Sequence, residues 1–190
     1  MTDKGGFPHY MLKEIFEQPK GLRDTIEPRV SLDEGMVKLE DVHIGERELN
    51  SLRRINIVAS GTSRHAGMAG QYMIQELVDL PVEVDYASEF EYRNPLIGPS
   101  ELTIVITQSG ETADTTAAQR EAKAKGSHTI AISNVEDSTI AREADGRLST
   151  YAGPEVSIAS TKAFTAQMAV LYLFAIYLGQ VRGKLTKEQI

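Results

Sequence analysis

The 190-residue sequence contains no cysteine and no tryptophan. The missing cysteine excludes disulfides, thiolate zinc sites, iron–sulfur clusters and cysteine nucleophiles together. Because a chain of this length can bury roughly 70% of its unfolded surface, it does not need such crosslinks to fold. At about 150 residues per domain, the length predicts one domain with room for an appendage.

Positive charge is also scarce. The sequence has 20 Lys and Arg residues against 27 Asp and Glu residues, a formal net charge of −7. Nucleic acids and anionic membranes bind clustered positive charge, so neither is expected as a partner. The longest apolar run, residues 168–178, is shorter than the ~18–20 residues that span a bilayer, and residues 1–10 lack the apolar stretch of a signal peptide. We therefore expect a soluble, cytoplasmic protein.

Common catalytic and cofactor motifs are missing as well. Neither G-x-G-x-x-G nor G-x-x-x-x-G-K-[ST] occurs, which disfavours a nucleotide-binding flavodoxin-like module, and the absence of G-x-S-x-G disfavours a serine hydrolase. Lys162 is better explained by an ion pair than by a role as a base. The histidines are scattered, and no pair of them has the spacing of a metal site: His9, His43, His65 and His128. We expect neither a metal nor a cofactor.

From residue 54 onward, short apolar runs alternate with helical patterns. This alternation predicts an α/β fold with a mostly parallel sheet, in three layers with helices on both faces. Five strands are expected, at residues 55–59, 82–86, 102–106, 128–133 and 147–151. Helices are expected at residues 63–80, 111–125 and 138–143, and again from about Ser160.

Residues 1–50 follow a different pattern and are expected to form a helical and irregular arm, with the main domain at residues 51–190. Apolar side chains at helical spacing predict a helix over residues 10–18 that Pro19 ends. Residues 21–45 show no clear period. The helix after Thr161 is apolar nearly all round, so it is either central to the core or covered by another domain or subunit.

Hydroxyl-rich loops follow the first and third expected strands, at residues 60–63 and 107–112. In a flavodoxin-like strand order these two strands are neighbours at the topological switch point, where ligands bind. The free N–H groups of a helix beginning near Glu111, and a backbone left open at Gly110, suit a phosphate monoester. Ser and Thr are also routine helix caps and turn residues. Two such loops on neighbouring strands favour a binding site over that simpler explanation.

Five stretches, at residues 9–19, 60–67, 81–95, 107–115 and 152–167, carry a family resemblance. The sequence resembles the first sugar isomerase (SIS) subdomain of glutamine–fructose-6-phosphate aminotransferase (isomerizing), the glucosamine-6-phosphate synthase family. That family makes glucosamine 6-phosphate from fructose 6-phosphate and glutamine-derived ammonia. The resemblance implies a flavodoxin-like SIS fold, a sugar phosphate ligand and a homodimer.

The resemblance also implies site residues. The phosphate would be held by Thr107, Gln108, Ser109 and Thr112. The sugar hydroxyls would meet Thr62, Ser63, Ser160 and the backbone near Ile158. The sequence departs from the usual family residues at four positions close to the site, which are Ser60, Arg64, Thr107 and Ser157.

No catalytic residue is implied for this chain. The family's ring-opening histidine, proton-moving glutamate and imine-forming lysine belong to the second SIS subdomain and the C-terminal tail, and its glutaminase nucleophile is a cysteine. We therefore expect the sugar-phosphate-binding half of an isomerase domain, inactive alone, which self-associates through apolar surface along the helix after Thr161. The alternative is a stand-alone, non-catalytic sugar-phosphate sensor or interaction module. The open reading frame beyond residue 190 distinguishes the two.

Overall fold

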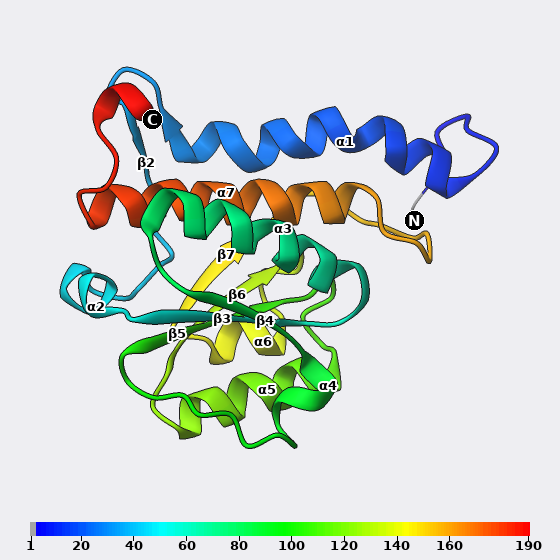
Figure 1. The fold of residues 1–190 in the computed structure, drawn as a ribbon. Coiled ribbons are helices and arrows are strands. Elements are labelled where there is room, and N and C mark those ends of the chain that lie inside the picture. The colour runs from blue at the N-terminus through cyan, green and yellow to red at the C-terminus, as the bar shows by residue number, and fades with distance from the viewer. Residues whose placement is uncertain (1–2) are drawn as a thin grey trace.

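The computed structural model describes residues 3–190 and is built around a five-stranded sheet (Figure 1). All neighbouring strands are parallel, and their order is β4-β3-β5-β6-β7. The strands are β3 (Arg54–Ala59), β4 (Val82–Tyr86), β5 (Glu101–Ile106), β6 (His128–Ser133) and β7 (Gly146–Ser149). This is the flavodoxin-like order, so the α/β fold class and the adjacency of the first and third strands are confirmed.

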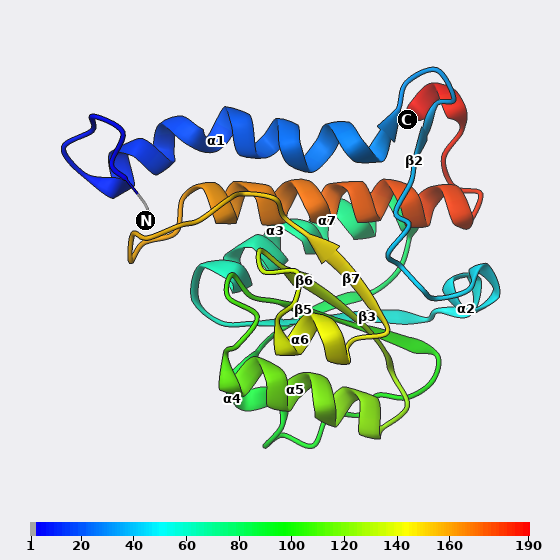
Figure 2. The same ribbon diagram turned by 180° about the vertical axis from the view of Figure 1, so that it is seen from behind.

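Helices cover both faces of the sheet (Figures 1 and 2). One face carries α3 (Gly61–Val78) and α7 (Lys162–Val181), and the other carries α4 (Ala87–Phe90), α5 (Ala113–Ala124) and α6 (Thr139–Glu143). Two separate apolar clusters fill the two faces, because side chains alternate along each strand. Ile57 and Ile104 belong to the α3–α7 side, and Val58 and Val105 belong to the α5 side.

The prediction that Pro19 ends the first helix is wrong, since α1 runs through it (Tyr10–Ile26). A proline inside a helix leaves the carbonyl four residues earlier without its usual N–H donor. Here that carbonyl belongs to Ile15, and the Gln18 side-chain amide donates to it at 3.0 Å. The helix also packs along α7, which stabilises it beyond its own sequence preference.

The predicted irregular stretch at residues 21–45 contains more structure than its pattern indicates. A 3₁₀ turn (Glu27–Arg29) follows α1, and β1 (Val30–Ser31) and β2 (Met36–Val37) then form an antiparallel hairpin. Gln180 of α7 holds this hairpin, since its side chain accepts from the Val37 amide and donates to the Val37 carbonyl. After α2 (Glu46–Ser51) the chain enters the sheet. A second 3₁₀ turn (Lys187–Gln189) follows α7, close to residue 190.

Helix α7 is the apolar helix predicted after Thr161. Two explanations were offered for its apolar surface, a central place in the core or cover by another domain or subunit, and α7 combines a core position with a covered side. One side of α7 lies on the sheet and α3, and α1 lies alongside another side (Figure 1). By length and composition alone, the whole of α7 could cross a membrane, although its unbroken apolar run at residues 168–178 is shorter than a bilayer span. Half of the 18-residue window that meets this test is buried inside the protein, as in a core helix. The protein's own α1 therefore covers much of the apolar surface that was expected to mark an interface.

Helices α3 and α5, which follow β3 and β5, begin at residues slightly different from those predicted. Helix α3 begins at Gly61 rather than residue 63, because Gly61 adopts a φ of +54° that turns the chain directly from strand into helix. Helix α5 begins at Ala113, with Thr112 as its N-cap residue, rather than at residue 111. These shifts place Thr62 and Ser63 in the first turn of α3.

Candidate sugar-phosphate site

A cavity of about 200 Å³ lies at the carboxyl ends of β3 and β5, as predicted for this strand order. Five of the seven predicted site residues line it: Ser63, Thr107, Gln108, Ser109 and Thr112. The remaining lining residues are Ser60, Ile106 and Thr115. Thr62 and Ser160, the other two predicted site residues, lie outside this lining.

The turn after β5, residues 107–112, is called here the β5 loop. Its hydroxyls and amides are drawn together, with the Thr107 and Thr112 hydroxyls 3.0 Å apart. The Gly110 amide donates to the Thr107 hydroxyl at 3.3 Å, and the Glu111 amide donates to the Ser109 hydroxyl at 3.2 Å. The loop thus gathers neutral donors beside the first turn of α5.

Helix α6 is hydrogen-bonded to the β5 loop at Gly110 and Glu111. The Ile140 amide donates to the Gly110 carbonyl at 3.2 Å, and the Thr139 amide donates to the Glu111 carboxylate at 2.7 Å. The hydrogen bonds from Thr139 hold the pKa of the Glu111 carboxyl below its ordinary value. Gly110 has a φ of +71°, and a Cβ there would overlap the side chain of Ser138, the N-cap of α6.

The anchoring role of Glu111 was missed at the level of sequence. The contact joins Glu111 to a residue twenty-eight positions further along the chain. No local sequence pattern indicates a contact between residues so far apart. Ser138 is the N-cap residue of α6, since its hydroxyl accepts from the Ala141 amide at 3.4 Å.

Electrostatically, the cavity is suited to an anion without using a basic side chain. Within the described part of the chain, its lining contains no Lys or Arg. The positive end of the α5 dipole and the unpaired N–H groups of its first turn lie beside the β5 loop. Such a helix start binds phosphate groups, and hydroxyl donors add directed hydrogen bonds.

The β3 side of the crevice is fixed by α7. The Gln167 side-chain amide donates to the Ser63 hydroxyl at 3.1 Å, and Gln167 is itself buried. This contact orients Ser63 in the cavity wall. Ser60, the N-cap residue of α3, lies in the same wall.

Ser160 belongs to the segment before α7, residues 150–161, which is called here the α7 loop. Its hydroxyl donates to the Glu155 carboxylate at 2.9 Å, which leaves the oxygen lone pairs available to accept a hydrogen bond. The other Glu155 oxygen accepts from the amides of Thr161 and Ala163 and so caps α7.

Arg64, one of the positions that depart from the family pattern, is stacked at the crevice edge. Its guanidinium lies 3.9 Å from the centre of the Tyr86 ring, a cation–π contact between the first turn of α3 and the end of β4. The arginine is thus accommodated by an aromatic neighbour rather than by a carboxylate.

A larger cavity of about 410 Å³ lies beside the first half of β3, but its charges are already paired. Arg54 donates to Glu101 at 2.8 Å, and Arg93 forms an ion pair with Asp85. Because these pairs occupy the groups that would recognise a ligand, the smaller hydroxyl-lined cavity is the stronger candidate. Among residues 3–190, no group of three His, Asp or Glu side chains is arranged to hold a metal ion.

The fold is that of a sugar isomerase domain: the chain belongs to the SIS domain family, which matches residues 48–177. It is 51% identical to glutamine–fructose-6-phosphate aminotransferase (isomerizing) from Clostridium tetani, over 100% of this chain and 31% of that protein. The same enzyme from Chlorobaculum tepidum is 53% identical, over 99% of this chain and 30% of that protein.

A solved structure gives the same result. The C-terminal domain of glucosamine-fructose-6-phosphate aminotransferase from Francisella tularensis matches with a TM-score of 0.92 at 38% identity, over 100% of this chain and 52% of that one. The resemblance to the first SIS subdomain of this enzyme family is therefore confirmed. The chain spans about a third of the length of the curated relatives it matches.

Proposed function

We propose that this chain is the sugar-phosphate-binding half of an isomerase domain that converts fructose 6-phosphate and glutamine-derived ammonia to glucosamine 6-phosphate. The observation that carries the proposal is the cavity at the switch point, where the hydroxyls of Thr107, Ser109 and Thr112 meet the start of α5. The identity to the aminotransferases of Clostridium tetani and Chlorobaculum tepidum supports the choice of substrate.

In this proposal the phosphate occupies the cavity. Its volume of about 200 Å³ is below the ~300 Å³ of a small-molecule pocket, so it suits the phosphate end rather than the whole ligand. The sugar then extends toward Thr62, Ser63 and Ser160, whose hydroxyls match its own. We assign no proton transfer to this chain, which is inactive alone because the reacting groups belong to the rest of the enzyme.

Calorimetry on the 190-residue chain tests the proposal. We expect fructose 6-phosphate and glucosamine 6-phosphate to bind, and fructose itself, which lacks the phosphate, to bind far more weakly. No binding of either sugar phosphate by folded protein would reject the site assignment. An assay with fructose 6-phosphate and ammonia should form no glucosamine 6-phosphate, and turnover by the isolated chain would contradict its proposed inactivity.

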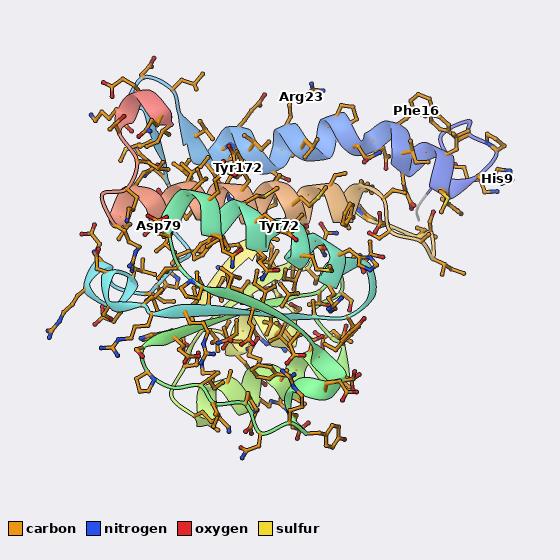
Figure 3. All side chains as sticks on the ribbon, viewed as in Figure 1. His9, Phe16, Arg23, Tyr72, Asp79 and Tyr172 are labelled. Carbon is orange, nitrogen blue, oxygen red and sulfur yellow. The ribbon has the colours of Figure 1, made fainter. Side chains whose placement is uncertain are left out.

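We further propose that the protein is cytoplasmic and forms a homodimer. Apolar side chains on α1 support the dimer, since Met11, Leu12, Ile15 and Phe16 are exposed. Figure 3 shows Phe16 and Arg23 pointing away from the body of the protein. Light scattering tests the dimer, and a monomer at high concentration would contradict it. A sugar-phosphate sensor without catalysis remains the second candidate, favoured only if the reading frame stops after residue 190.

A further inference from the structure

We propose that α1 positions the α7 loop, with Glu14 and Glu17 as positioning residues for the sugar end of the site. This inference rests on the proposed function, because the α7 loop carries Ser160. Figure 2 shows the segment before α7 passing close to the N-terminal half of α1. Glu14 and Glu17 touch neither the cavity nor the β5 loop, so their effect on a ligand is indirect.

Glu14 makes the central contact. It lies in the apolar-patterned first half of α1, yet it is only 2% exposed. Its Oε1 accepts hydrogen bonds from the amides of Val156 at 2.6 Å and Ser157 at 3.2 Å. Two consecutive loop amides therefore depend on one carboxylate more than 140 positions earlier in the chain.

The charge state of Glu14 fits this role. Burial raises the pKa of its carboxyl, but hydrogen bonds from Ser157 and Val156 and the nearby Lys162 charge lower it, and the net pKa lies below the ordinary value of 4.5. The group is therefore an ionised acceptor at neutral pH. A charged acceptor binds amides more strongly than a neutral one.

Glu17 makes a second contact one turn further along α1. Its carboxylate lies 2.7 Å from the ammonium of Lys162, which is only 4% exposed and is the first residue of α7. This pair fixes the end of the α7 loop, just after Ser160. A buried lysine needs such a partner, because an unpaired charge inside the protein is costly.

The same side of α1 continues past the acidic residues. Gly21 lies against Ala152, where a Cβ at Gly21 would be 3.6 Å from the Ala152 Cα, and the Thr25 hydroxyl donates to the Thr150 carbonyl. Glu14, Glu17, Gly21 and Thr25 are spaced by three or four residues, which places them on one helix face. That face follows the chain from residue 150 to residue 162.

The α7 loop is held at its start by a residue at the end of the sheet and further along by α1. The first part of the α7 loop is tied to the end of β6, where the Asn134 side chain accepts from the Ala152 amide and donates to the Gly153 carbonyl. From Val156 onward the loop leaves the sheet, and Glu14 provides its contacts to the body of the protein. The arm thus fixes the segment that carries Ser160 and the backbone near Ile158, which the proposed function assigns to the sugar.

The test compares two ligands in Glu14→Ala. Fructose 6-phosphate reaches the α7 loop, whereas inorganic phosphate needs only the β5 loop. We expect Glu14→Ala to weaken fructose 6-phosphate binding by about tenfold and to leave phosphate binding within about twofold. Glu14→Gln keeps an acceptor oxygen and should restore most of the affinity. Asp24→Asn, which removes an exposed carboxylate on the same helix, is the matched control and should bind both ligands normally.

The outcomes separate cleanly. Equal weakening of both ligands, or no change in either, would overturn the positioning role. If Glu14→Ala does not fold, Glu17→Gln is measured instead, with the same selective loss expected. If the unaltered chain binds neither ligand, the proposed function fails, and amide hydrogen exchange then decides the inference. Exchange at Val156 and Ser157 should be at least tenfold faster in the Glu14 variant, with Gly110 unchanged, and equal rates would overturn the inference.

Discussion

The two loops that form the candidate site are supported in different ways. The β5 loop is held by its immediate neighbours in the doubly wound sheet, β6 and α6, and by hydrogen bonds within its own six residues. The α7 loop is longer. Beyond residue 153 its own Glu155 ties it to the start of α7, and its contacts to the body of the protein come from Glu14 and Glu17 of an added N-terminal helix. The proposed phosphate end of the site is therefore part of the SIS fold itself, whereas the proposed sugar end depends on the arm.

This difference has a consequence for substrate choice. A loop fixed by the sheet keeps one geometry, which suits the phosphate that all sugar phosphates share. A loop held by an added helix can differ between proteins that share the fold without disturbing the phosphate site. The following substitutions test this division, from the largest expected effect to the smallest.

Gly110→Ala should have the largest effect on stability and on phosphate binding, because Gly110 lies in the rigid β5 loop. A Cβ at this positive φ is strained and overlaps the Ser138 side chain, which caps α6. We expect a loss of about 2–5 kcal/mol in the free energy of unfolding, measured with denaturant. Phosphate binding should also be lost. Gly98→Ala is the control, since a Cβ there meets no atom within 4 Å. A stable Gly110→Ala variant that binds phosphate normally would show that the loop is not rigid.

Ser109→Ala combined with Thr112→Ala should come next. The pair removes two hydroxyl donors from the β5 loop and should weaken phosphate binding by about 1–3 kcal/mol in total, or about fivefold to 150-fold. Fructose 6-phosphate and inorganic phosphate should lose affinity alike, in contrast to Glu14→Ala. Calorimetry measures both, with Ser51→Ala on α2 as the control. A loss confined to the sugar phosphate would assign the β5 loop to the sugar instead.

The β5 loop was predictable from sequence because all its determinants are local. A buried apolar run ends, hydroxyls and Gly110 follow, and a helix begins, so the pattern alone indicates strand, turn and phosphate site. The parallel sheet followed from the alternation of strands and helices, and the flavodoxin-like strand order was implied by the family resemblance. The predicted positions of the strands were close to those observed. Predicted helix starts were off by two residues where Gly61 and Thr112 set them.

The support of the α7 loop was not predictable, since it joins residues far apart in sequence. A glutamate in an amphipathic helix gives no sign that it will accept hydrogen bonds from Val156 and Ser157. The error at Pro19 has the same origin. Local chemistry favours a helix end there, but the Gln18 side chain and the packing of α1 on α7 outweigh it.

A double-mutant cycle on Glu17→Gln and Lys162→Met should give a smaller effect on stability. Lys162 is buried but Glu17 is about one-third exposed, so water weakens their attraction. We expect a coupling free energy of about 1 kcal/mol from denaturant unfolding. The exposed pair Lys20 and Asp24 on the same helix is the control, with about 0.3–0.5 kcal/mol expected. Equal coupling for both pairs would mean that the burial of Lys162 adds nothing to its attraction to Glu17.

The smallest effect, and the sharpest comparison of the two loops, is the pH dependence of their carboxylate anchors. The pKa values of Glu14 and Glu111 both lie below 4.5 in the folded protein. A depressed pKa stabilises the fold above the unfolded value, and this contribution is lost as pH falls through the folded value. The free energy of unfolding of the unaltered chain should therefore fall below pH 4.5 relative to Glu14→Gln or Glu111→Gln, because neither glutamine titrates.

Salt separates the two carboxylates. Glu14 is buried and hydrogen-bonded to amides, so its pH-dependent term should be nearly the same at low salt and in about 1 M salt, where the Debye length is about 3 Å. Glu111 is exposed and lies near Arg142, so the part of its term that comes from that charge should shrink. Denaturant unfolding of the two glutamine variants between pH 3 and pH 6 measures both terms. If salt reduces the pH-dependent terms of Glu14 and Glu111 equally, Glu14 is exposed to water. It would then not be the buried positioning residue proposed for the α7 loop.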